Sequence, residues 1–371
     1  MVKIQYIMKG RYMNTQFRIS KLRENMKENA IDIVIIYSIE NRRYFSNFTG
    51  SSGALIITEN DVQLFTDFRY LEQAEAQVKN DVDVVRHGGG LLDESIAHKI
   101  ASMEGTIGVE GNLTLTTYRL FEERNNEVEY TIIDELIMNI RRVKDNDELD
   151  QIREGVRLCD LAFEHILSFI KPGISEKDIG LELEYFMKKN GAEGIKANHV
   201  IASGERSALP HGAASQRIVN EGEFVKMDYG AVVNGYFTDF TRTVVLGDPS
   251  EKQRHIYNIV YTALEESLKH IGPGKTCSEL DDIGRSIISD AGYGDNFGHS
   301  LGHSLGLNIH EKPAMRSTDH SKLEPGMVIT VEPGIYIAGW GGVRIEDLLI
   351  ITEDGYENLT KSTKDLQILN T

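Results

Sequence analysis

The distribution of proline along the chain constrains the fold more than any other feature of the sequence. All seven prolines lie between Pro172 and Pro333, and the first 171 of the 371 residues contain none. Proline fixes φ and removes a backbone donor, so it interrupts regular elements and marks the turns between them. We therefore expect two regions that are built differently, and we place one domain at residues 13–143 and the other at residues 144–371.

The first region alternates two kinds of pattern. Short apolar or alternating runs are typical of strands, and longer segments with apolar residues at helical spacing are typical of helices. The expected strands cover residues 31–37, 53–58, 62–67, 82–87, 106–110 and 128–133, and the expected helices cover residues 17–29, 70–78, 93–103 and 116–124. The first region is therefore expected to be an α/β domain.

The second region contains the same succession of signals twice. Each copy has an amphipathic helix that ends at a Pro-Gly pair, after which a Ser or Thr can cap a second helix. The two leading helices are expected over residues 147–170 and 255–271, and the two caps are Ser175 and Thr276. Strand-rich, glycine-bearing sequence follows each copy. This weak internal duplication predicts two αα–ββ halves that form an α+β domain.

Composition argues against several classes of partner and compartment. Lys and Arg number 40 and Asp and Glu 57, which gives a net charge of −17. Such a chain lacks the basic field that binds nucleic acid or anionic lipid, so we expect neither as a partner. The two cysteines, Cys159 and Cys277, are far apart and form no CxxC motif. The N-terminus has no apolar segment typical of a secretory signal, and we expect a cytoplasmic protein without a membrane span.

One motif is misleading. The sequence Gly-His-Ser-Leu-Gly occurs twice, around Ser300 and Ser304, and matches the G-x-S-x-G elbow of serine hydrolases. An elbow requires a buried strand directly before the serine. Residues 290–297 are polar and rich in glycine instead. We therefore expect neither serine to be a nucleophile.

A predicted hairpin brings two carboxylates together. Two apolar runs flank Asn234-Gly235, the preferred pair for a two-residue type I′ turn. This turn places Asp228 opposite Thr241, and Asp239 then lies diagonal to Asp228 on the same face. Two carboxylates at roughly 7–8 Å repel one another unless water or a cation lies between them. Taken alone, the pair is also compatible with two solvated aspartates on an exposed face.

Further candidate ligands follow in the chain. Glu332 ends an apolar run, and Glu346 lies within another, where a carboxylate is costly unless it is paired or bound to metal. His299, His303 and His310 fall within twelve residues. Taken singly, each histidine is more often a hydrogen-bonded structural residue than a ligand.

Together these residues resemble the metal-binding series of the pita-bread metallopeptidases. The series here is Asp228 and Asp239, then His299-x-x-x-His303-x-x-Gly306-Leu-x-x-His310, then Glu332-Pro-Gly334, then Arg344-Ile-Glu346. Residues 48–53 and 66–70 of the first region resemble the N-terminal domain of Xaa-Pro aminopeptidases, prolidases and creatinases. The resemblance implies a creatinase-like α/β domain followed by an α+β pita-bread catalytic domain.

The resemblance also implies a two-metal centre. Asp228 would chelate one divalent ion, His303 and Glu332 would hold the second, and Asp239 and Glu346 would bridge both. Four carboxylates and one imidazole form a mostly hard donor set, which suits Mn²⁺ best, with Co²⁺ or Zn²⁺ as other candidates.

Roles for the remaining residues come from the same resemblance. Glu332 would act as general base. His211 and His310 would donate hydrogen bonds to the substrate and the developing oxyanion. The three residues implied near the position after the scissile bond are His299, Tyr336 and Arg344.

The implied activity is removal of the N-terminal residue ahead of proline, as in Xaa-Pro aminopeptidases, by a homodimer. The alternatives are an Xaa-Pro dipeptidase, a metal-free amidinohydrolase similar to creatinase, and a non-catalytic binding module. One departure from the family pattern stands out, because Lys196-Ala197 replaces the usual Ser-Phe pair before residues 200–204.

Overall fold

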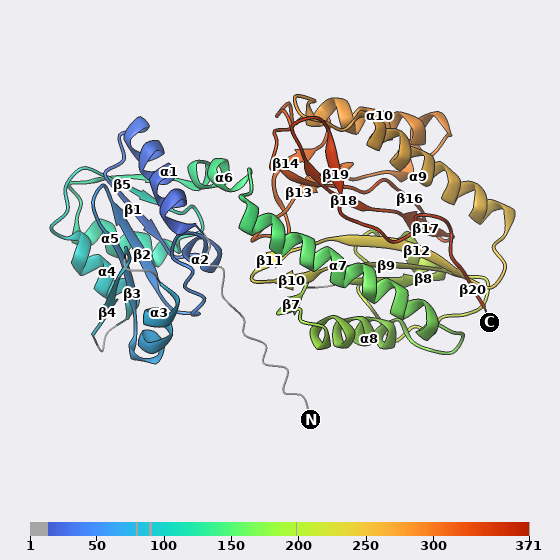
Figure 1. The fold of residues 1–371 in the computed structure, drawn as a ribbon, viewed down its shortest axis with the longest axis horizontal. Helices are drawn as coiled ribbons and strands as arrows, with labels where there is room; N and C mark the ends of the chain where they lie inside the picture. The colour runs from blue at the N-terminus through green and yellow to red at the C-terminus, as the bar shows by residue number, and fades with distance from the viewer. Residues whose placement is uncertain (1–13, 79–80, 89–90, 198, 371) are drawn as a thin grey trace. The chain divides into compact units, whose positions relative to one another are not determined.

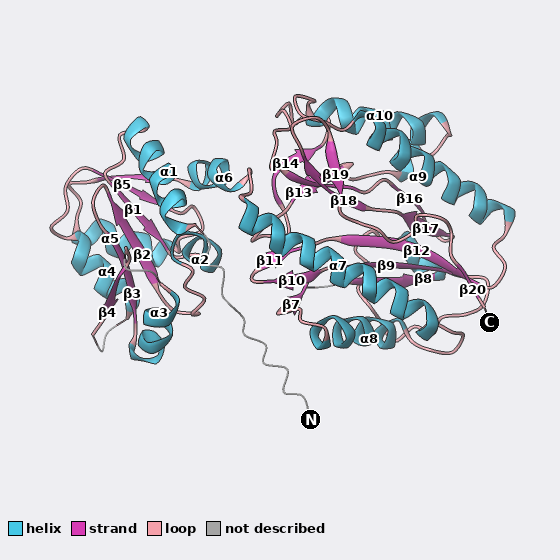
Figure 2. Cartoon of the chain, viewed as in Figure 1, coloured by secondary structure: helices cyan, strands magenta, loops and turns pink. Residues whose placement is uncertain are grey.

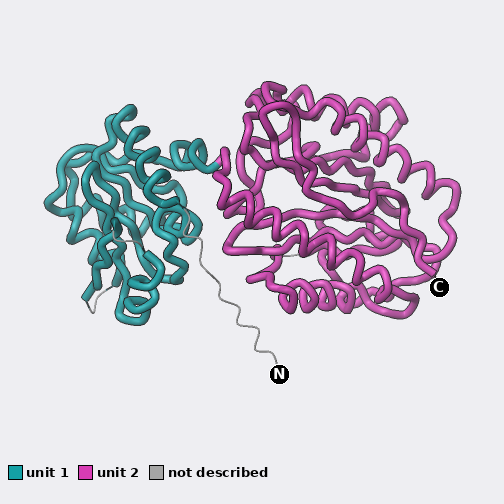
Figure 3. The backbone as a smooth tube through the Cα atoms, in the orientation of Figure 1, with its two compact units in different colours: residues 1–141 teal, residues 142–371 magenta. Residues whose placement is uncertain are grey.

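The structure is a computed structural model that describes residues 14–78, 81–88, 91–197 and 199–370. The N-terminal segment, for which we expect no secretory signal, lies mostly outside the described residues, which begin at residue 14. The backbone forms two compact units, residues 1–141 and residues 142–371 (Figure 3).

The described part of unit 1 contains a six-stranded sheet with the order β4-β3-β2-β1-β5-β6 (Figure 1). The strands are β1 (Ile33–Ile36), β2 (Ala54–Thr58), β3 (Val62–Thr66), β4 (Asp83–Arg86), β5 (Thr106–Val109) and β6 (Glu129–Ile132). The helices are α1 (Thr15–Glu28), α2 (Ile39–Ser46), α3 (Leu71–Gln77), α4 (Leu92–Ile100), α5 (Leu115–Arg124) and α6 (Asp134–Arg141). The expected strands and helices are confirmed, whereas the short helices α2 and α6 were not predicted. The central strand β1 is buried along its whole length, as its uninterrupted apolar run requires.

Unit 2 combines four helices with several small sheets in its described residues (Figure 2). The helices are α7 (Asn146–Phe169), α8 (Glu176–Lys189), α9 (Glu251–His270) and α10 (Cys277–Asp290). The strands of the first half are β7 (Gly194–Ile195), β8 (Val200–Ser203), β9 (Phe224–Tyr229), β10 (Ala231–Val233), β11 (Tyr236–Phe237) and β12 (Phe240–Leu246). Those of the second half are β13 (Gly302–Ser304), β14 (Glu311–Met315), β15 (Val328–Val331), β16 (Gly334–Ile337), β17 (Gly341–Arg344), β18 (Asp347–Ile351), β19 (Tyr356–Asn358) and β20 (Ile368–Leu369).

The two halves of unit 2 repeat one arrangement. Helices α7 and α8 share a buried core with the β8-β9-β12 sheet, and both Phe163 and Val225 belong to this core. Helices α9 and α10 share another core with the β13-β15-β18 sheet, and both Leu264 and Ile329 belong to it. Ser175 and Thr276 cap α8 and α10 with capping boxes. The duplication and the α+β class predicted from the sequence are therefore confirmed.

The hairpin register follows the prediction. Val233 pairs with Tyr236, and Asp228 pairs with Thr241. Asn234 has φ of 46° and Gly235 has φ of 75°, as a type I′ turn requires. Among the described residues, no helix has the length and apolar character needed to cross a membrane.

Candidate active site

Five candidate metal ligands lie on separate strands or strand ends of unit 2. Asp228 belongs to β9 and His303 to β13, whereas the other three lie in short connections between strands. Asp239 directly precedes β12, Glu332 directly follows β15, and Glu346 lies between β17 and β18. The site is therefore assembled from both halves of the duplicated fold.

Gly230 allows the two aspartates of the hairpin to approach one another. A Cβ atom placed on Gly230 would lie 1.8 Å from the carbonyl oxygen of Thr238, so only glycine fits at this position. The segment that returns from the hairpin can then pass close to the end of β9. As a result, Asp239 arrives beside Asp228.

The carboxylates gather in a buried cluster. One oxygen from each of Asp228, Asp239 and Glu346 lies within 4.8 Å of the other two, and all three residues are buried. The Nε2 atom of His303 lies 3.3 Å from Glu332 Oε1 and 3.7 Å from Asp239 Oδ2. The fold thus brings all five residues of the series together.

The orientation of His303 suits a ligand. Its Nδ1 lies 3.0 Å from the carbonyl oxygen of Ser304, which can only accept a hydrogen bond, so Nδ1 is the protonated nitrogen. In the neutral ring the lone pair is then on Nε2, the atom that faces the carboxylates. A backbone carbonyl behind a histidine is a common support for a metal ligand.

Glu346 shows that the cluster fits a cation. Its Oε2 atom accepts a hydrogen bond of 2.7 Å from Thr241 Oγ1, but its buried Oε1 atom has no hydrogen-bond partner. Burial and the neighbouring Asp239 and Glu332 carboxylates raise the pKa of Glu346 well above its usual value. A bare carboxylate oxygen inside a cluster of four carboxylates and one imidazole is what a hard divalent ion would satisfy.

The three candidate substrate residues form one chain of hydrogen bonds. Arg344 Nη1 donates to the Tyr336 hydroxyl at 2.8 Å, and this hydroxyl donates to His299 Nε2 at 2.8 Å. His299 Nδ1 faces the carbonyl oxygen of Ser300, so Nε2 is the acceptor. Burial and the positive charge of Arg344 lower the pKa of His299 to about 3, which keeps its imidazole neutral. Arg344 also bonds to Asp228 and so connects this chain to the carboxylate cluster.

His310 and His211 lie at the edge of the site. The ring centroids of His310 and His303 are 4.5 Å apart, and the part of the His310 ring that is shielded from water, together with the nearby His303, lowers the pKa of His310. The carbonyl oxygen of Pro210, directly before His211, accepts a hydrogen bond of 3.2 Å from Arg344. Both histidines are exposed, so they can reach a bound molecule.

Two lysines of the site were not predicted from the sequence. The Lys196 ammonium bonds to both Asp228 and Asp239. Lys226, two residues before Asp228 on the same strand face, donates to the carbonyl oxygens of Ser207 and Leu209. The departure from the family's Ser-Phe pair was the sequence feature that could have marked Lys196 as a site residue. For Lys226, the corresponding feature was a lysine within an apolar strand.

Burial and the neighbouring positive charges have opposite effects on the pKa of Asp228. Burial acts to raise the pKa of Asp228, but the positive charges of Lys196 and Arg344 outweigh burial and hold that pKa below its usual range. Asp228 is therefore ionised across the physiological pH range.

The structure also excludes the serine elbow. Ser304 ends strand β13 and is fully buried, and the next regular element is strand β14. An elbow requires a helix after the serine, with the hydroxyl exposed. The sequence-based rejection of a serine hydrolase is confirmed for Ser304.

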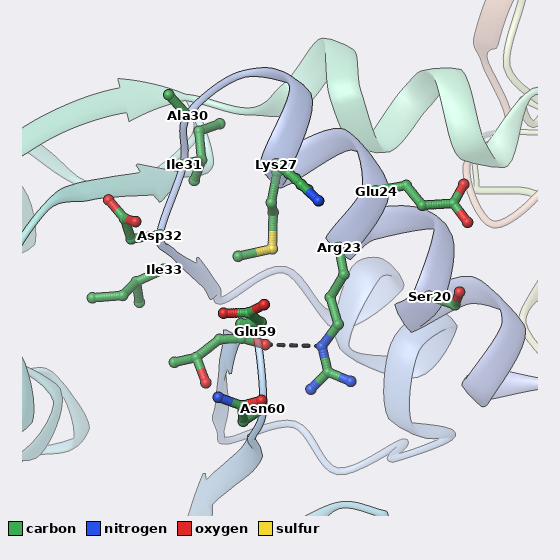
Figure 4. A pocket seen from close by; sticks show the side chains of 12 residues that line it. Ser20, Arg23, Glu24, Lys27, Ala30, Ile31, Asp32, Ile33, Glu59 and Asn60 are labelled. Carbon is green, nitrogen blue, oxygen red and sulfur yellow. Dashed lines mark hydrogen bonds between the residues drawn. The ribbon is translucent and has the colours of Figure 1, made fainter.

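A separate cavity of about 780 Å³ lies in unit 1, between α1, β1 and the β2–β3 turn (Figure 4). Arg23 crosses it and donates a hydrogen bond of 2.9 Å to the carbonyl oxygen of Thr58. None of the candidate site residues is among the residues that line this cavity.

Comparison with known proteins agrees with this geometry. The model of metallopeptidase family M24 matches residues 150–353, and that of the creatinase/prolidase N-terminal domain matches residues 18–143. The chain is 42% identical to an Xaa-Pro dipeptidase of Pyrococcus furiosus, over 94% of this chain and 99% of that protein.

Two solved structures extend the comparison. An Xaa-Pro dipeptidase from Bacillus anthracis superposes with a TM-score of 0.92 at 43% identity, covering 96% of this chain and 100% of that one. An X-Pro aminopeptidase from Thermotoga maritima MSB8 superposes with a TM-score of 0.85 at 36% identity, covering 93% and 99%.

The fold and the buried carboxylate cluster thus define a hydrolytic metallopeptidase that uses divalent metal. The chain belongs to metallopeptidase family M24, in the form that carries a creatinase/prolidase N-terminal domain. The resemblance and the pita-bread fold inferred from the sequence are confirmed.

Proposed function

We propose that the protein is an exopeptidase that hydrolyses the Xaa-Pro bond at the N-terminus of peptides with two divalent ions, Mn²⁺ by preference. The observation that carries the proposal is the convergence of five ligand residues from both halves of unit 2, with one buried carboxylate oxygen of Glu346 left without a partner. Asp228 would hold one ion, His303 and Glu332 the other, and Asp239 and Glu346 both. When bound, such ions activate water and polarise the scissile carbonyl.

The protein's own residues would supply the proton transfers. Burial raises the pKa of Glu332, which suits a general base that must take a proton near neutral pH. His310 and His211 are exposed at the edge of the cluster and would donate hydrogen bonds to the substrate and the oxyanion. A neutral His310 can donate such a bond without adding charge.

The chain from His299 through Tyr336 to Arg344 would bind the residue after the scissile bond. Proline offers no N–H and has a fixed φ, so a proline-specific enzyme needs a rigid pocket. These three side chains are held in place by mutual hydrogen bonds, and Arg344 is also buried. The substrate's free amine would lie toward the acidic cluster.

An Xaa-Pro dipeptidase is the second candidate, and the names of the relatives favour it. The relatives at 42% and 43% identity are called Xaa-Pro dipeptidases, whereas the one at 36% is called an X-Pro aminopeptidase. Both activities cleave the same bond. They differ in whether the pocket accepts chain beyond proline. We also propose that the enzyme is a homodimer, as the resemblance to the family implies.

The substrate panel that tests this proposal contains Xaa-Pro, Xaa-Pro-Yaa, Xaa-Ala-Yaa and N-acetylated Xaa-Pro-Yaa. We expect cleavage of the proline peptides with a free amine and little cleavage of the other two. Activity confined to the dipeptide would select the dipeptidase. Equal rates on the alanine and proline tripeptides would contradict proline specificity.

A further inference from the structure

Lys196 lies where the chemistry of the site calls for a metal ion. Its ammonium contacts the Oδ1 atoms of both Asp228 and Asp239, and its side chain is 14% exposed. The position of the lysine is fixed by the backbone, because its N–H donates to the carbonyl oxygen of Gly230 at 2.8 Å and β7 pairs with β10 directly beside it. The ammonium therefore enters between the two aspartates from across Gly230.

The carboxylate oxygens divide into two groups. Both oxygens of Asp228 have a cationic partner, because Oδ1 accepts from Lys196 and Oδ2 from Arg344. Asp239 presents Oδ1 to Lys196 but turns Oδ2 toward His303. Glu332 Oε1 likewise lies 3.3 Å from His303 Nε2, and its Oε2 lies 3.7 Å from Arg344 Nε, whereas Glu346 Oε1 has no hydrogen-bond partner. The Lys196 ammonium thus contacts the oxygens of Asp228 and Asp239 that lie away from His303.

The net charge of the cluster also distinguishes the two metal positions. When all four carboxylates of the series are ionised, as metal ligands must be, they carry a formal charge of −4; Lys196 and Arg344 contribute +2, which leaves −2. That remainder matches one divalent ion. A centre with serine in place of Lys196 would keep −3 and would attract a second ion more strongly.

We propose that the Lys196 ammonium competes with one of the two metal ions, namely the ion that Asp228 would hold. This inference rests on the proposed metal-dependent function. One ion binds tightly on the His303 side, and the other binds only when Lys196 leaves the aspartates. The apparent affinity for the second ion is lowered by the fraction of time that its ligands are available. Activity then follows the concentration of free divalent ions.

Metal binding to the full-length enzyme tests the proposal directly. Wild type, Lys196→Met and Lys196→Ser are stripped with chelator, titrated with Mn²⁺ by calorimetry, desalted and analysed for bound metal at one fixed pH. Lys188→Met is the matched control, because Lys188 is exposed on α8 and, among the described residues, its ammonium pairs with the half-exposed carboxylate of Glu184 at 2.7 Å.

We expect wild type and Lys188→Met to retain about one equivalent of Mn²⁺ per chain after desalting, and both Lys196 variants to retain about two. If the ammonium occupies the weaker site nine-tenths of the time, the affinity of that site for Mn²⁺ should rise about tenfold or more in the Lys196 variants. The metal-free Lys196 variants should also melt at a lower temperature than metal-free wild type, because two buried aspartates lose a counter-charge. Mn²⁺ should raise their melting temperature more than it raises that of wild type.

An unchanged or weaker second site in both Lys196 variants would overturn the proposal, because it would make the lysine a support of the site rather than a competitor. In that case wild type would still bind Mn²⁺ and cleave Xaa-Pro peptides, and the proposed function would stand. If neither wild type nor the variants bound Mn²⁺ while peptide cleavage persisted in chelator, the metal-dependent function would fail and this inference with it.

Discussion

Replacing Arg242 with methionine should destabilise unit 2 by about 3–5 kcal/mol, the usual cost of removing one partner of a buried ion pair. Arg242 on β12 is 1% exposed, and its Nη2 lies 2.9 Å from Asp347 Oδ1, which is fully buried. The guanidinium also donates to four backbone carbonyl oxygens, including that of Glu346. Methionine keeps an unbranched apolar stem, but it is shorter than arginine and satisfies none of these acceptors.

The remaining partners of Asp347 limit the loss. Its Oδ2 atom accepts hydrogen bonds from Asn358 at 2.7 Å and from Lys364 at 3.1 Å, so the carboxylate is not left isolated. For a domain of this size, each kcal/mol shifts the melting temperature by about 2–4 °C. The expected decrease is therefore roughly 6–20 °C.

The single tryptophan, Trp340, makes the assay specific for unit 2. Its ring packs against Phe224 at 6.0 Å, and Lys252 lies over it at 4.5 Å, so its fluorescence reports unfolding of this unit. Lys188→Met on the surface of α8 is the control and should change stability by less than about 1 kcal/mol. A loss for Arg242→Met no larger than that of the control would refute the reasoning about the buried pair.

Three further results are expected. Glu332→Gln should lower kcat by about 10²–10⁴-fold with a smaller effect on peptide binding, because it removes the proposed base. Ser304→Ala should keep peptidase activity. The reverse pattern in steady-state kinetics would favour the serine mechanism instead. Asp239→Asn should weaken Mn²⁺ binding by calorimetry, and unaltered affinity would show that Asp239 is no ligand. Because burial raises the pKa of Glu346, its proton must leave when an ion binds, so Mn²⁺ affinity should increase as the pH rises. Calorimetry in buffers of different ionisation enthalpy should detect the released proton. Mn²⁺ binding without proton release would contradict this linkage.

The sequence predicted those parts of the fold that local rules determine. The two-residue Asn234-Gly235 turn fixes its hairpin register, and the pairing of Asp228 with Thr241 followed by counting. Long apolar periodicities gave the major helices, but α9 begins at Glu251 rather than at residue 255. Its polar first turn is held by the Ser250 capping box, which apolar periodicity does not reveal.

The sequence could not predict contacts that arise only when distant segments meet. The helix α2 (Ile39–Ser46) has eight residues and little apolar periodicity, so it escaped notice. Pairing of Arg242 with Asp347 joins residues 105 positions apart. The family pattern pointed to the carboxylate series, and the departure from the Ser-Phe pair marked Lys196 as unusual. That departure did not indicate that the ammonium would lie between Asp228 and Asp239, because this contact arises only in the folded chain.

The most direct test of the account measures bound Mn²⁺ and Xaa-Pro-Yaa hydrolysis on the same samples of wild-type enzyme, after chelator treatment and during stepwise readdition of Mn²⁺. We expect no hydrolysis without bound metal and a rate that rises with occupancy, because the proposed mechanism uses the bound ions to activate water and to polarise the scissile carbonyl. Full activity in chelator with occupancy near zero would contradict it.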